Sequence, residues 1–150
     1  ENYEARANLM WAGTIALNGL LSTGKETDWA THEIEHQLSA RYDMTHGLGL
    51  AILTPHWMEY VLSDKTAGKM AEYARNVWLV QDSDNFEAAR NGIRLTREFF
   101  HKIGLKGSLQ ELGVTAESLP VMAENAAANP IGRFKQLVAE DVLKILQSAY

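Results

Sequence analysis

The chain contains the segment Thr31-His-Glu-Ile-Glu-His-Gln-Leu-Ser-Ala-Arg-Tyr-Asp-Met-Thr-His-Gly47, which holds three of its five histidines. These are His32, His36 and His46, and no other part of the sequence has a comparable density of side chains able to bind a metal. Neutral imidazole is the commonest protein ligand for zinc and iron, and carboxylates or water can complete the coordination. The segment therefore predicts a metal site.

Helical spacing limits which of these histidines can share one ion. His32 and His36 lie one turn apart on the same face of a helix, so their rings can converge. Fourteen residues of unbroken helix would separate His32 from His46 by about 21 Å, too far for ligand bonds of about 2 Å. His46 can join only if the chain reverses between residues 42 and 47, where Asp43 is suitable for a turn. Spacing alone therefore favours His32 and His36, with His46 dependent on a reversal.

The residues His32-Glu33-Ile34-Glu35-His36 also match the H-E-x-x-H pattern of zinc metallopeptidases, in which the glutamate activates a water molecule. The metzincin extension is excluded, because it needs glycine and histidine where the chain has Ser39 and Tyr42. Glu59 is the nearest candidate for a further ligand. No strand-rich segment precedes the motif to hold an extended peptide. A peptidase therefore remains an alternative to be tested.

A purely structural role for the histidines is a second alternative, and it would make the chain a non-catalytic helical interaction module. Histidines on a half-apolar helix are often ordinary core or surface residues. Trp29, Ile34 and Leu38 are expected in the core of the protein. Glu33 and Glu35 are expected to be solvated charges on the outer face of the helix.

The composition excludes several classes of function. A net charge of −5 with no basic cluster disfavours nucleic-acid binding. The absence of cysteine excludes disulfides and thiolate ligands, so a metal must take imidazole or oxygen donors. No apolar run approaches the roughly 20 residues needed to span a bilayer. With 46% hydrophobic and 22% charged residues, the chain is an ordinary globular protein, compatible with a cytoplasmic enzyme.

Apolar residues recur at helical spacing and strand-like alternation is scarce, which predicts an all-α, multi-helix bundle. The expected helices span about Tyr3–Leu21, Asp28–Tyr42, Gly47–Leu62, Lys65–Val77 and Asp84–Ile103, followed by a turn at Leu109–Leu112, a helix after Thr115 and a last helix at about Ala139–Gln147. Pro55 should break or kink its helix. The irregular segment Ala128–Phe134 is expected to border a cleft or a partner domain. His56 and His101 are expected to be structural or exposed.

Three stretches carry a resemblance to a known family: Asn18-Gly19, the segment from Asp28 to Asp43, and His46-Gly-Leu-Gly-Leu-Ala-Ile-Leu-Thr-Pro-His56. With the closing residues Glu140–Leu146, they closely resemble the C-terminal domain of iron-containing alcohol dehydrogenases, in the butanol dehydrogenase and aldehyde reductase branch. The resemblance covers essentially the whole chain. Its His-x3-His-x9-His-Gly pattern is far more specific than H-E-x-x-H.

This resemblance implies the helical, dehydroquinate synthase-like fold of that domain for residues 1–150. It implies a metal, Fe²⁺ or Zn²⁺, held by an aspartate and three histidines, of which two correspond to His32 and His46. The intervening His36 would then be catalytic without being a ligand, which reverses the preference drawn from spacing alone. The remaining ligands and most contacts with NADH or NADPH would belong to an N-terminal nucleotide-binding domain absent from this chain.

The function implied by the resemblance is the interconversion of primary alcohols and aldehydes by a nicotinamide-dependent dehydrogenase. The chain begins at Glu1, without methionine, in what reads as a helix already under way. We therefore expect it to be part of a longer protein and to be inactive alone. The expected partners are a small alcohol or aldehyde, the chain's own N-terminal domain and a second copy in a homodimer, with no nucleic acid and no membrane.

Overall fold

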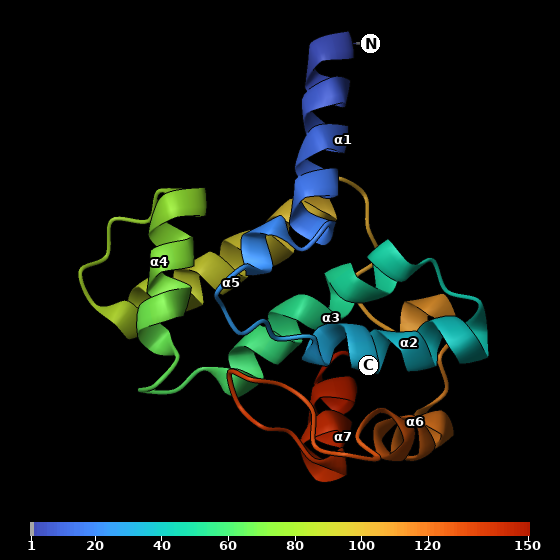
Figure 1. The fold of residues 1–150 in the computed structure, drawn as a ribbon. Coiled ribbons are helices and arrows are strands. Elements are labelled where there is room, and N and C mark those ends of the chain that lie inside the picture. The colour runs from blue at the N-terminus through green and yellow to red at the C-terminus, as the bar shows by residue number, and fades with distance from the viewer. Residues whose placement is uncertain (1) are drawn as a thin grey trace.

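The computed structural model describes residues 2–150, and Figure 1 shows them as helices joined by loops. The α-helices are α1 (Tyr3–Leu17), α2 (Ala30–Tyr42), α3 (His46–Val61), α4 (Ala67–Trp78), α5 (Asn85–Lys102), α6 (Leu119–Ala126) and α7 (Ala139–Ser148), and the 3-10 helices are η1 (Leu20–Ser22), η2 (Gln110–Leu112) and η3 (Ala116–Ser118). Within residues 2–150, β-type pairing is limited to one antiparallel bridge between Ile131 and Leu137. The predicted all-α fold is confirmed.

Helix α3 lies at the centre of the bundle and packs against α2, α5 and α7. It runs through Pro55 as one helix, so the break expected there does not occur. A proline inside a helix costs about 3 kcal/mol, whereas each buried large apolar side chain contributes about 1.5–3 kcal/mol. Leu53, Met58 and Val61 are all buried along this helix. Their packing on several sides is sufficient to keep α3 continuous.

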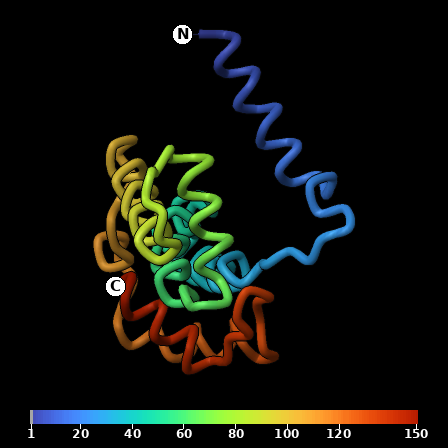
Figure 2. Tube along the Cα trace, turned by 90° about the vertical axis from the view of Figure 1, so that its left-hand side faces the viewer, coloured from blue at the N-terminus to red at the C-terminus, as the bar shows by residue number. Residues whose placement is uncertain are grey.

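Helix α1 is shorter than predicted and does not pack on the bundle. It ends at Leu17 because Gly19 takes a left-handed conformation with φ 85°, while the side chain of Asn18 accepts a hydrogen bond from the backbone N–H of Leu20. None of its residues is buried, and both views show it projecting away from the other helices (Figures 1 and 2). Leu9 and Trp11 remain largely exposed on it.

Asp28 joins the start of α2 to the loop that precedes α7. One carboxylate oxygen accepts a hydrogen bond from the backbone N–H of Ala30 at 2.8 Å, as expected for a residue that caps this helix. The other oxygen accepts from the backbone N–H groups of Arg133 and Phe134 at 2.6 and 2.8 Å. The irregular segment near residue 132 is thereby held beside the first turn of α2.

Among the helices described for residues 2–150, none combines the length and the hydrophobicity needed to cross a bilayer.

Candidate metal centre

The chain reverses direction between α2 and α3, as the participation of His46 requires. Helix α2 ends at Tyr42, and Asp43 adopts the left-handed conformation with φ 49°, which aspartate tolerates better than most residues. The next residues run back along α2. The carbonyl oxygen of Met44 consequently lies 3.1 Å from the hydroxyl of Ser39 on that helix. Helix α3 then begins at His46, one residue earlier than predicted.

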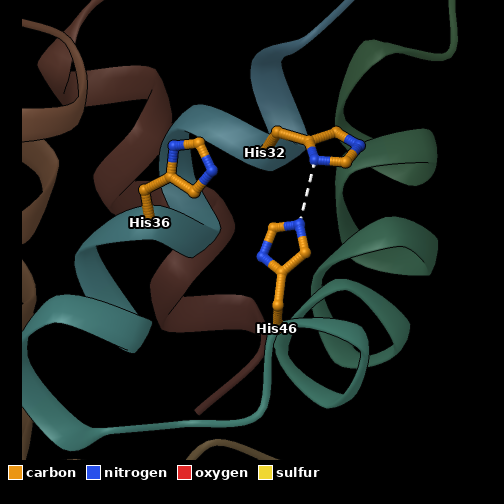
Figure 3. Close-up of side chains that lie close together, drawn as sticks. All are labelled: His32, His36 and His46. Carbon is orange, nitrogen blue, oxygen red and sulfur yellow. Dashed lines mark hydrogen bonds between the residues drawn. The ribbon is translucent and has the colours of Figure 1, made fainter. Parts of the chain in front are cut away.

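This reversal brings the three predicted histidines together. Figure 3 shows His32 and His36 on α2 and His46 at the start of α3. The Nδ1 atom of His32 faces the Nε2 atom of His46 at 3.2 Å. One ring nitrogen from each of the three residues lies within 4.8 Å of the others. Residues fourteen positions apart in the sequence are therefore neighbours in space.

The pair formed by His32 and His46 fits a single metal ion. Metal–nitrogen bonds of about 2.0–2.1 Å hold two ligand nitrogens about 2.9–3.4 Å apart when the angle at the ion is about 90–110°. The observed 3.2 Å between the facing nitrogens lies in that range. Burial lowers the pKa of His32 below its usual value, and the imidazoles of His46 and His36 lower this pKa further. The neutral imidazole that binds a metal is thus favoured at His32.

His36 is placed differently from the other two. Its ring is stacked on that of His46, with centroids 5.4 Å apart and planes inclined by 25°, while the His32 ring lies 6.4 Å away. No hydrogen bond joins the ring of His36 to either neighbour among the described residues. The side chain is exposed beside the pair. It can therefore reach a small molecule bound at the cluster.

Glu35 is the site residue that sequence reasoning placed wrongly. Glu33 is exposed as expected, but Glu35 has no exposed surface. Its carboxylate is paired with Nδ1 of His46 and accepts a hydrogen bond from Ser39 at 2.6 Å. Helical spacing gave only a partial signal, because position 35 lies three residues before the buried Leu38 and so flanks the apolar face, but what covers it comes from α3.

The three apolar residues near the histidines differ in burial. Ile34 and Leu38 are buried as predicted. Trp29 is not a core residue, because 46% of its surface is exposed and its ring lies against His32, with centroids 4.7 Å apart. Trp29 also borders a surface cleft of about 510 Å³, together with Lys25, Gly132 and Arg133. The irregular segment near residue 132 therefore does border a cleft, and Trp29 links this cleft to His32.

The residues expected outside the cluster lie outside it. Glu59, considered as a peptidase ligand, forms an ion pair with Arg97 at 3.1 Å. His56 lies 3.1 Å from the hydroxyl of Ser148, and His101 lies on α5. In the part of the chain that the structure describes, the three clustered histidines form the only group with metal-binding geometry.

Comparison with known proteins gives a consistent result. The family model described as "Fe-containing alcohol dehydrogenase family, C-terminal" matches residues 1–150. The NADH-dependent butanol dehydrogenase A of Clostridium acetobutylicum is 50% identical over 154 residues, covering 100% of this chain and 40% of that protein. The NADPH-dependent aldehyde reductase YqhD of Escherichia coli is 39% identical over 123 residues, covering 81% of this chain and 31% of that protein.

A solved structure has a similar fold. The crystal structure of NADH-dependent butanol dehydrogenase A from Thermotoga maritima superimposes with a TM-score of 0.91 and 36% identity, covering 99% of this chain and 39% of that one. The chain thus spans about two fifths of the length of these butanol dehydrogenases.

Proposed function

Because the chain belongs to the iron-containing alcohol dehydrogenase family, we propose that the intact protein interconverts primary alcohols and aldehydes with a nicotinamide cofactor. The observation that carries this proposal is the 3.2 Å approach of His32 Nδ1 to His46 Nε2, made by two residues that are fourteen positions apart. An imidazole pair of this geometry suits a divalent ion. It also agrees with the ligand spacing implied by the family resemblance.

We propose that His32 and His46 hold Fe²⁺ or Zn²⁺, with further ligands supplied from outside this chain. The bound ion would supply Lewis acidity, which polarises an aldehyde carbonyl or stabilises the alkoxide of the alcohol. The two imidazoles fix the position of that acidity at the junction of α2 and α3. Residues 43–45 connect the two helix ends, and the carbonyl oxygen of Met44 lies 3.1 Å from the Ser39 hydroxyl on α2.

We propose His36 as the catalytic residue that is not a ligand. Its ring is exposed and stacked on His46, so it can contact a substrate at the cluster without entering the coordination sphere. Histidine changes protonation near neutral pH, which suits it to relay the proton gained or lost by the substrate oxygen. It can equally orient the substrate against the nicotinamide ring.

The finer parts of the proposal rest on relatives and on the resemblance. One of the relatives is named an NADH-dependent butanol dehydrogenase and another an NADPH-dependent aldehyde reductase. We therefore propose a small primary alcohol or aldehyde as substrate and NADH or NADPH as hydride carrier. The carrier would be bound mainly by an N-terminal domain outside this chain. A homodimer and a cytoplasmic location remain predictions.

The test uses the intact protein, its metal content after gel filtration, and its reduction of butanal by NADH or NADPH. His32→Ala and His46→Ala should each lose bound metal and nearly all turnover, because a missing ligand leaves the ion poorly held. His101→Ala serves as the control, since that histidine lies outside the cluster. Full metal occupancy in both cluster variants would refute the proposed site. Hydrolysis of peptides without nucleotide would instead support the zinc peptidase.

A further inference from the structure

Glu35 is the only ionisable side chain classed as buried among the described residues, and its exposed surface is 0%. Moving a carboxylate out of water is costly unless the charge is paired and hydrogen-bonded. A buried carboxylate is therefore expected to have polar partners. Each carboxylate oxygen of Glu35 has one such partner.

The partners of Glu35 come from both sides of the chain reversal. Oε1 accepts a hydrogen bond from the Ser39 hydroxyl at 2.6 Å, one turn further along α2. Oε2 contacts Nδ1 of His46 at the start of α3. Ser39 also lies 3.1 Å from the carbonyl oxygen of Met44, within the reversing segment. The carboxylate is thus fixed on one side and directed at His46 on the other.

The facing helix leaves space for this carboxylate. Gly49 is buried on α3, and a Cβ atom at this position would lie 2.7 Å from both Cγ and Oε1 of Glu35. Atoms at that distance clash, so any larger residue at position 49 would displace the carboxylate. Glycine at position 49 therefore leaves the space that the Glu35 side chain occupies beside His46.

We propose that Glu35 is a positioning residue that holds His46 in the tautomer with hydrogen on Nδ1. A neutral imidazole carries one N–H group. When a carboxylate accepts a hydrogen bond from Nδ1–H, Nε2 keeps its lone pair and can coordinate a metal. Nε2 is the atom that faces His32 at 3.2 Å. Hydrogen bonding of a ligand histidine to a carboxylate fixes the tautomer and the orientation of the ring. This inference rests on the proposed metal site and adds a residue to it.

The two proposed ligands are supported in different ways. His46 is 45% exposed in its side chain but is held by a fully buried carboxylate. His32 lies against the ring of Trp29, which offers no comparable acceptor. The direct contact of Glu35 is therefore with His46, whereas Glu35 acts on His32 only through its charge, which raises the pKa of His32 against the larger lowering by burial.

The experiment compares Glu35→Met, which removes the acceptor at similar volume, with Glu35→Gln, whose carbonyl oxygen can still accept from Nδ1–H. In the intact protein, Glu35→Met should lower the affinity for Zn²⁺ by about 10–100-fold, measured by chelator competition. Glu35→Gln should recover much of that loss. Glu33→Gln, an exposed neighbour on the same helix, should retain the original affinity.

A second readout does not depend on metal or activity. In metal-free protein with ¹⁵N-labelled histidine, the His46 nitrogen shifts should report the Nδ1–H tautomer. They should shift toward a mixture in Glu35→Met and stay near the original values in Glu35→Gln. Unchanged His46 nitrogen shifts in folded Glu35→Met would overturn the inference. Failure of Glu35→Gln to fold would also overturn it, because Glu35 would then be needed for folding and not only for positioning His46.

The outcomes separate this inference from the proposed function. If His32→Ala and His46→Ala lose metal while Glu35→Met keeps its original affinity, only the role of Glu35 is refuted. If both histidine variants keep their metal, the proposed site fails and the role of Glu35 fails with it. Loss of affinity in Glu33→Gln equal to that in Glu35→Met would also contradict the inference.

Discussion

His36 and His46 have the same side chain but different surroundings, and this difference predicts different roles. The His46 ring is held by Glu35 and faces His32, whereas the His36 ring is exposed and stacked beside them. If the proposed function holds, we expect His36→Ala in the intact protein to keep its bound metal. Turnover should fall by about 10²–10⁴, the range for loss of a positioned acid or base. Metal analysis and steady-state kinetics on the same preparation measure both quantities.

The comparison variants are His32→Ala and His46→Ala, which should lose metal. If one-turn spacing decides the ligands, His36→Ala should lose metal as severely as His32→Ala does. Metal loss in His36→Ala together with retention in His46→Ala would reverse the assignment and favour the peptidase alternative. A pH–rate inflection that is unchanged in His36→Ala would argue against the proton-relay role.

At the level of elements, α4 and α5 approach closely because α5 has a glycine at their contact. A Cβ atom at Gly92 would lie 2.6 Å from Cβ and 3.1 Å from Cα of Ala74. Gly92→Ala should therefore force the helices apart. We expect a net loss of about 1–2 kcal/mol in the free energy of unfolding, since overpacking costs about 1–3 kcal/mol and replacing a helical glycine regains up to about 1 kcal/mol. Denaturant unfolding of the chain measures this change.

Gly68→Ala on α4 is the matched control. The nearest atom to a Cβ there is the side-chain nitrogen of Asn85 at 3.9 Å, an ordinary contact distance. This variant should be neutral or more stable by up to about 1 kcal/mol, because alanine is the better helix former. Equal destabilisation by both substitutions would show that the close approach of α4 and α5 is not the cause.

At the level of the whole molecule, the 150-residue chain has its own apolar core, and under the proposed assignment it supplies two metal ligands, His32 and His46. We expect the purified chain to be folded and helical, with weak metal affinity and no dehydrogenase activity. Ligand number sets both affinity and geometry at a metal site. Far-ultraviolet circular dichroism and an alcohol-dependent assay of nicotinamide reduction test these expectations. A spectrum dominated by strand, or measurable reduction of the nicotinamide, would refute them.

Helix α1 should behave separately from the rest of that chain. It has 15 residues and none of them is buried, and helices of this length are marginal in water without tertiary packing. Backbone amides of α1 should therefore exchange with solvent much faster than those of α3 and α5. Hydrogen exchange followed by mass spectrometry distinguishes the helices. Slow exchange in α1 of the monomeric chain would contradict the prediction.

The sequence by itself determined the helical fold class, most helix positions and the three histidines, because helical periodicity and ligand chemistry are local properties of the chain. It placed the start of α5 correctly, since Asp84 accepts a hydrogen bond from the backbone N–H of Glu87 at 2.9 Å. The family resemblance predicts His46 as the partner of His32, whereas spacing along one helix predicts His36, and the choice of ligand stays a prediction. Spacing could not show the contact between His32 and His46, because that contact is made across a turn.

Tertiary structure alone decided the remaining features. Helix α3 continues through Pro55 because packing on several sides outweighs a local cost. Helix α1 buries none of its residues, although its sequence contains apolar residues such as Leu9 and Trp11. Glu35 is buried because it contacts Ser39 on the next turn of α2, and His46 and Gly49 on α3. Whether a charge is solvated or buried depends on what packs over it, and that is set only when α2 and α3 come together.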